Sequence, residues 1–91
     1  MKEIRTLLTE PMFANLCKKG YYTAESNEDL FFTKEDIRLL ANGKIVEKEA
    51  NYGQAKCLFM LQDIGFDHIN EILKRSPIFA DLAGNFINHQ P

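Results

Sequence analysis

The segment KIVEKEANYGQAKCLFMLQDI, residues 44–64, decides the fold class, because its first part fits either a helix or a strand. Its apolar and small residues recur at spacings of three and four, which is the period of one helix face. These residues are Val46, Ala50, Gly53, Cys57, Met60, Leu61 and Ile64. We therefore expect one long helix that ends at Gly65. The alternative is a shorter helix capped by Asn51 with Gln54, which leaves residues 44–49 to run as a strand or an extended segment.

The preceding segment carries the clearest helix start in the chain. Thr33 stands three residues before Asp36, the spacing of a capping box. Phe32 and Ile37 have the spacing of a hydrophobic staple across the same start. An Asn-Gly pair at 42–43 tolerates the left-handed conformation that ends a helix. These signals predict a short helix between residues 33 and 43.

Four further short helices are predicted on either side of this pair. In residues 2–9 the apolar side chains Ile4, Leu7 and Leu8 share one helix face. Pro11 suits the first turn of a second helix, which we expect to end at Gly20. After Gly65, Asp67 caps a short helix, and Ser76 with Pro77 opens a last one.

The predicted fold is therefore mainly α, a compact orthogonal bundle of five or six short helices in a single domain over residues 1–91. One segment departs from the helical period. Near residues 20–32, strand-forming aromatic residues flank a polar, turn-forming centre, so a short β-hairpin is an option there. The tail from about residue 87 is expected to fray.

Length and composition limit the possible functions. The chain has 91 residues and a formal net charge of −2, with 11 Lys and Arg against 13 Asp and Glu. Tight, sequence-independent phosphate binding needs an excess of cations, which this composition lacks. A domain of this size also has little apolar area left to wall a deep pocket, so we expect neither a bound cofactor nor an enzyme.

The two cysteines, Cys17 and Cys57, lie forty residues apart in apolar patterns. This arrangement is typical of buried, reduced thiols in a cytoplasmic protein, not of a disulfide framework. The longest apolar run, Cys57–Leu61, is far shorter than the roughly 20 residues that cross a bilayer. We therefore expect a cytoplasmic protein that has no membrane contact.

Catalytic and metal-binding patterns are weak. Asp67, His68 and Glu71 would share a helical face, but a transition metal needs further ligands. Ser76 is better explained as a helix cap than as a nucleophile, and the five glycines stand alone and form no phosphate-binding loop. The sequence predicts no catalytic residues and no metal site.

The strongest functional pattern combines aromatic and acidic residues in and around the non-helical segment. Its predicted partner-binding residues are Tyr21, Tyr22, Glu28, Asp29 and Phe31. Exposed aromatic rings beside carboxylates are typical of a surface that anchors a protein partner. The leading hypothesis is a small, non-catalytic interaction or regulatory module that binds another protein, or itself, through the surface around Tyr21–Phe32.

The alternative is a small helical nucleic-acid-binding regulator. Pairs of cations stand at two predicted helix ends, Lys18 with Lys19 and Lys74 with Arg75. Leu61–Leu73 resembles the glycine turn of helix-turn-helix regulators, including the MerR type, and that of the ubiquitin-associated domain. Ile69 follows the glycine sooner than in either family, so no family is assigned.

Overall fold

The structure is a computed structural model of the chain, and it describes residues 1–86. The tail predicted to fray lies outside these residues. Strands and helices alternate along the chain. In order they are β1 (Lys2–Leu8), α1 (Glu10–Lys19), β2 (Tyr21–Thr23), β3 (Asp29–Phe31), α2 (Lys34–Ala41), β4 (Val46–Ala50), β5 (Ala55–Leu61), α3 (Phe66–Lys74) and the 3₁₀ turn η1 (Ala80–Leu82).

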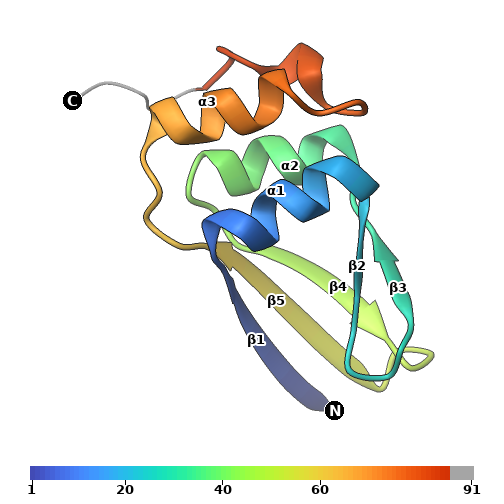
Figure 1. Cartoon of the computed structure of the whole chain (residues 1–91). Coiled ribbons are helices and arrows are strands. Elements are labelled where there is room, and N and C mark those ends of the chain that lie inside the picture. The colour runs from blue at the N-terminus through green and yellow to red at the C-terminus, as the bar shows by residue number, and fades with distance from the viewer. Residues whose placement is uncertain (87–91) are drawn as a thin grey trace.

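The domain is a mixed α/β structure, so the prediction of a mainly α, orthogonal bundle is wrong. A three-stranded sheet has the order β1-β5-β4, in which β1 runs parallel to β5 and β4 runs antiparallel to it. Strands β2 and β3 form a separate antiparallel hairpin. Figure 1 shows α1 and α2 next to the three-stranded sheet, with α3 packed beyond them against α1.

The core lies between this sheet and the elements that cover it. The inward-facing side chains of β5 are buried, and Phe59 is at their centre with 1% of its surface exposed. Its ring meets Tyr22 of the hairpin edge-on at a centroid distance of 5.2 Å, and Phe32 at 5.1 Å. Phe13 of α1 and Ile37 of α2 complete the same cluster. The hairpin therefore closes the core together with the helices.

The long helix predicted over residues 44–64 is two strands. A turn at Asn51, Tyr52 and Gly53, all with positive φ, separates β4 from β5. The alternative that left residues 44–49 extended is right for β4, but the helix expected after it is strand β5. Sheet burial explains the error, because a strand with apolar residues on both faces also places some of them at spacings of three and four.

Two other predicted helices are also wrong. Residues 2–8 form β1, where Ile4, Thr6 and Leu8 point toward the core while Leu7 is exposed on the other face. The helix expected after Pro77 is only the short η1 turn.

Several other local predictions are confirmed. Thr33 accepts from the Asp36 N–H (3.1 Å) and the Asp36 carboxylate accepts from the Thr33 N–H (2.9 Å), which makes the capping box of α2. Helix α1 ends at Gly20 with φ of 83°. The prediction that Asp67 caps the next helix is wrong, because α3 begins at Phe66, directly after Gly65, and no side chain among the described residues caps it. The hairpin considered near residues 20–32 is present as β2 and β3. Within residues 1–86, no helix has the length and apolar character needed to span a bilayer.

Candidate interaction surface

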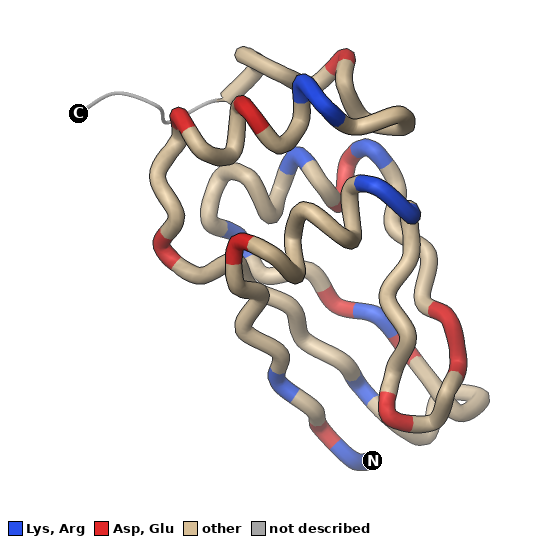
Figure 2. Tube along the Cα trace, in the orientation of Figure 1, with Lys and Arg blue, Asp and Glu red and all other residues tan. Residues whose placement is uncertain are grey.

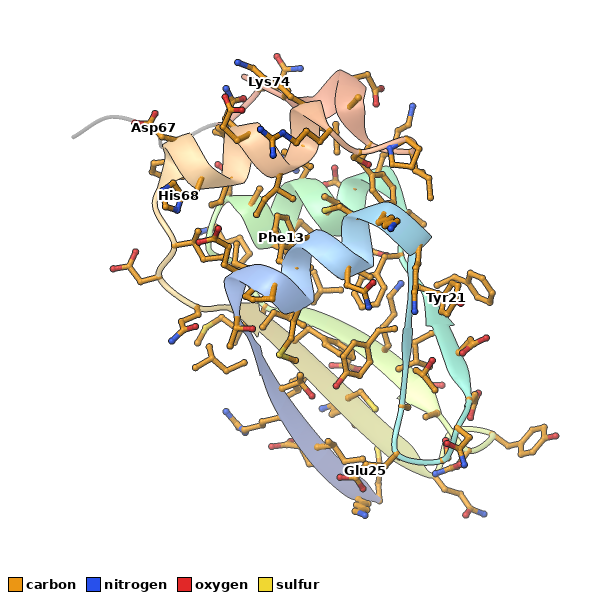
Figure 3. The ribbon with its side chains drawn as sticks, in the orientation of Figure 1. Phe13, Tyr21, Glu25, Asp67, His68 and Lys74 are labelled. Carbon is orange, nitrogen blue, oxygen red and sulfur yellow. The ribbon has the colours of Figure 1, made fainter. Side chains whose placement is uncertain are left out.

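The hairpin brings together two of the five residues predicted to bind a partner. Tyr21 and Phe31 are directly opposed across the strands, with ring centroids 5.7 Å apart. The Lys19 Nζ lies 5.7 Å from the centre of the Tyr21 ring, and Phe31 is 68% exposed. Figure 3 shows Tyr21 near the end of α1, on the outer side of the hairpin. Tyr21 and Phe31 thus form an outward-facing aromatic pair.

The other three predicted residues are engaged within the molecule. Tyr22 turns inward to Phe59. The Glu28 carboxylate accepts from the main-chain N–H of Asn51 (2.7 Å), and the Asp29 carboxylate accepts from the Thr23 hydroxyl (2.9 Å). These acidic groups therefore support the hairpin and its contact with the β4–β5 turn.

A second surface, which the sequence analysis missed, lies on the face of the three-stranded sheet away from the helices. We call this the open face. It carries an apolar row of Leu7 from β1, Met60 from β5 and Ile45, the residue just before β4, which are 52%, 42% and 55% exposed. Leu7 pairs with Met60, and extending the β4–β5 register by one position places Ile45 beside Met60. Half-buried Leu58 lies in the next row.

The apolar row continues into a cleft of about 420 Å³ at the end of the sheet. Leu7 and Met60 form one wall of this cleft, and Ile64 and Phe66, which lead into α3, contribute to the other. Asp63 is its one charged lining residue. The apolar row and the cleft together make a continuous, mainly apolar surface, and the charged residues of the open face, among them Lys56 paired with Glu47, lie toward the other end of the sheet.

A larger cleft of about 600 Å³ lies between α1 and α3. Its ionisable lining residues are Glu10, Lys18, His68, Glu71 and Arg75. His68 Nδ1 lies 3.1 Å from the Glu10 carboxylate, so its partner comes from α1 and not from Asp67 or Glu71, the residues grouped with it by sequence. Figure 3 shows His68 at the start of α3, on the side toward α1.

This α1–α3 cleft holds no activated nucleophile among its lining residues. The Ser76 hydroxyl donates to the main-chain oxygen of Cys17 (2.9 Å) and accepts from the N–H groups of Ile78 and Phe79. It therefore ties the end of α3 to α1, and His68 makes no contact with it. Within residues 1–86, no cluster of three His, Cys, Asp or Glu side chains is arranged to hold a metal ion.

Both thiols are buried and unpaired. Burial raises the pKa of Cys17 to about 12. Burial, together with the charges of Glu25 and Glu28, also raises the pKa of Cys57. Both groups are therefore protonated at neutral pH and are poor nucleophiles.

Basic residues are interspersed with acidic ones along the chain (Figure 2). Lys34 pairs with Asp81 (2.8 Å), and Arg38 pairs with Glu35 (2.6 Å). The predicted helix-turn-helix is absent at Gly65, because the element before α3 is strand β5 and not a helix. Lys18 and Arg75 do line one cleft, but they share it with two glutamates.

The chain matches no protein-family model, no curated protein and no solved structure.

Proposed function

We propose that this chain is a non-catalytic protein-interaction domain that binds the apolar side of a partner helix over the open face of its sheet. The observation that carries the proposal is the exposed apolar row of Leu7, Met60 and Ile45. Contiguous exposed apolar residues on a small domain mark a surface that another molecule covers.

The composition of β5 supports this proposal. Its sequence, AKCLFML, has Lys56 as its single charged residue. Such near-continuous apolar strands belong to parallel sheets whose two faces are both covered. Here β5 pairs in parallel with β1, yet within residues 1–86 α1, α2 and the hairpin cover one face only. A helix from a partner would supply the missing layer.

The cleft beside the apolar row gives such a helix an anchoring point. Its walls are mainly apolar, and they come from the sheet end, from α2 and from the start of α3. Interfaces are commonly anchored by one large apolar or aromatic side chain in a pocket of this kind. Asp63 in its lining would favour a cationic residue next to that side chain.

Site-specific photocrosslinking in the native host tests this proposal. A photoreactive phenylalanine derivative replaces Met60 on the open face, and in a matched control it replaces Tyr52, which is fully exposed on the β4–β5 turn. We expect an adduct of one discrete mass from position 60 and none of that mass from position 52. Adding Ile45→Glu should remove the adduct while the circular dichroism spectrum stays unchanged.

The proposal is wrong if position 60 gives no discrete adduct, or if its adduct survives Ile45→Glu. A third variant carries the photoreactive residue in place of Phe31. A discrete adduct from this variant, and none from position 60, would move the binding surface to the aromatic pair of Tyr21 and Phe31. That pair is the second candidate, because its rings stack outward beside Lys19. At that surface, Phe31→Ser should abolish partner binding without unfolding the domain, since Phe31 is largely exposed.

Nucleic-acid binding is the alternative function. Lys18 and Arg75 line the α1–α3 cleft together, which is the observation in its favour. Glu10 and Glu71 in the same cleft and the net charge of −2 oppose it. A titration with arbitrary duplex DNA at low salt separates the two functions, because phosphate contacts produce tight binding that falls steeply as salt is added. We expect no binding.

A cytoplasmic location belongs to the same proposal. Two buried cysteines that form no disulfide are typical of a reducing compartment.

A further inference from the structure

Strand β1 leaves one edge of the three-stranded sheet unpaired. Among residues 1–86 its single neighbour is β5. The Lys2 N–H donates to the Gln54 oxygen (3.0 Å), and the Leu8 oxygen accepts from the Gln62 N–H (2.8 Å). In a parallel ladder, alternate residues turn both main-chain groups to the same side. The even-numbered residues of β1 therefore face β5, and the main-chain groups of Glu3, Arg5 and Leu7 face outward.

The two edges of this sheet differ in their protection against further pairing. The outer strand β4 carries Lys48 on its inward side, where its ammonium group pairs with the Asp36 carboxylate. An inward-pointing charge is a known device that blocks edge pairing. In β1 the corresponding central residues, Ile4, Thr6 and Leu8, are uncharged, and the pairing with β5 continues without a bulge over all seven residues. Lys2 is the one inward charge, and it lies at the strand end, beside Glu25.

The charge pattern of β1 selects one antiparallel pairing with a second copy of itself. A two-fold axis at Glu3 would place two glutamates opposite each other, and an axis at Arg5 would oppose two arginines. An axis at Thr6 would place Glu3 opposite Thr9 of the second copy, and Thr9 lies beyond the strand, where it caps helix α1. An axis at Ile4 places each Glu3 opposite the Arg5 of the other copy, so the Arg5–Glu3 ion pair that one copy forms within its own strand (3.0 Å) would be exchanged for two pairs between copies. Opposite charges stabilise directly opposed strand positions, and like charges destabilise them.

The axis at Ile4 also satisfies the main-chain geometry. Glu3 and Arg5 both direct their N–H and C=O groups to the free edge, so each pair can exchange two hydrogen bonds. The two Ile4 side chains then meet in the close, non-hydrogen-bonded position on the inner side, where Ile4 is only partly buried within one copy.

We infer that two copies of this chain pair through the free edges of β1, in antiparallel orientation about Ile4, to form a continuous six-stranded sheet. The occupant of this edge is thus a second copy of the chain, and its recognition rests on two symmetric pairs of Glu3 with Arg5. This contact uses the edge of the sheet, so it leaves the open face available and does not depend on the function proposed above.

Charge-reversal variants test this pairing. Glu3→Arg opposes two arginines at each pair, and Arg5→Glu opposes two glutamates, so each variant alone should dimerise at least about tenfold more weakly than the natural chain. An equimolar mixture of the two variants restores opposite charges at both pairs. The registers about Glu3 and Arg5 behave differently, because there the natural chain itself opposes like charges and would pair more weakly than the mixture. Sedimentation equilibrium should therefore show a dimer for the natural chain and for the mixture, and monomers for each variant alone.

A variant that removes one main-chain hydrogen-bond donor provides a second test of the edge pairing. Arg5→Pro removes an N–H that faces outward and leaves the pairing with β5 intact, because proline is tolerated on the free side of an edge strand. The variant should keep the circular dichroism spectrum of the natural chain and sediment as a monomer. A monomeric natural chain overturns the inference. So does a mixture that stays monomeric while the natural chain dimerises, or a dimer that Met60→Glu abolishes and Arg5→Pro does not.

Discussion

Adjacent residues of β5 should differ strongly in the cost of truncation, because Phe59 faces the core and Met60 faces outward. Phe59 is 1% exposed and meets two aromatic rings edge-on, at 5.1 and 5.2 Å. Truncating a buried Phe to Ala costs about 3–5 kcal/mol, and aromatic pairs of this geometry place the value toward the upper end. We expect Phe59→Ala to lower the free energy of unfolding by about 4–5 kcal/mol.

Met60→Ala should cost about 0.5–1 kcal/mol. The side chain is 42% exposed, and its removal opens no internal cavity. Urea denaturation followed by circular dichroism measures both values, with the slope of the transition as a check that the unfolded state is unchanged. If Phe59→Ala leaves too little folded protein to measure, Phe59→Leu provides a milder variant, with an expected cost of about 1–2 kcal/mol.

The reverse order of costs would refute the strand assignment. In the helix predicted from the sequence, Met60 lies on the buried stripe and Phe59 does not. Equal costs would refute the open face, because they would mean that both sides of β5 are covered in the isolated chain.

Three further predictions concern local interactions. Thr33→Ala removes the capping box of α2 and should cost about 1 kcal/mol in a thermal or urea melt; an unchanged melting temperature would contradict the cap. Burial alone would raise the pKa of Asp36, but hydrogen bonds from Lys48 and from Thr33 outweigh burial and lower this pKa. The unfolded state therefore binds more protons than the folded state in acid. The free energy of unfolding should fall as the pH drops below about 4. Asp36→Asn should flatten that acid limb of the pH–stability curve, and a limb as steep as in the natural chain would contradict the assignment. Alkylation of Cys17 and Cys57 at neutral pH should follow the unfolded fraction and accelerate with urea, whereas rapid labelling of the folded domain would show accessible thiolates.

Helix ends were predictable from the sequence because their signals are local. The capping box at Thr33 and the glycine at 20 act through main-chain conformation or hydrogen bonds within a few residues. The end of α1 and the start of α2 are accordingly found where they were expected, whereas Gly65, expected to end a helix, lies between strand β5 and α3.

Strand pairing was not predictable, because its partners are far apart in the chain. Residues 2–8 pair with residues 55–61, and neither segment alone shows a strict alternation of apolar and polar side chains. Leu7 illustrates the ambiguity. It follows Ile4 at a helical spacing, but it is exposed on the opposite face of the strand from Leu8.

The two candidate surfaces also differ in whether the sequence alone could predict them. Tyr21 and Phe31 could be selected from sequence because they flank one short turn. The apolar row required the sheet order, since Leu7 lies on β1, Met60 on β5 and Ile45 just before β4, and only the β1-β5-β4 arrangement makes them neighbours. Met60 was assigned to the core because an exposed methionine within a mostly apolar run has no local signal that distinguishes it from a buried one.

The free edge and the open face have a combined consequence if both proposals hold. Pairing about Ile4 keeps the outward sides of the two sheets on the same side, so two apolar rows would face one direction on a single six-stranded sheet. A partner that presents two helices would then bind both rows, and the second contact would form at a high effective concentration. Arg5→Pro, which breaks the edge pairing but leaves Met60 and Ile45 in place, should therefore weaken binding to a bivalent partner far more than binding to an isolated helix of that partner. Equal effects on the two ligands would show that the edge and the face act separately.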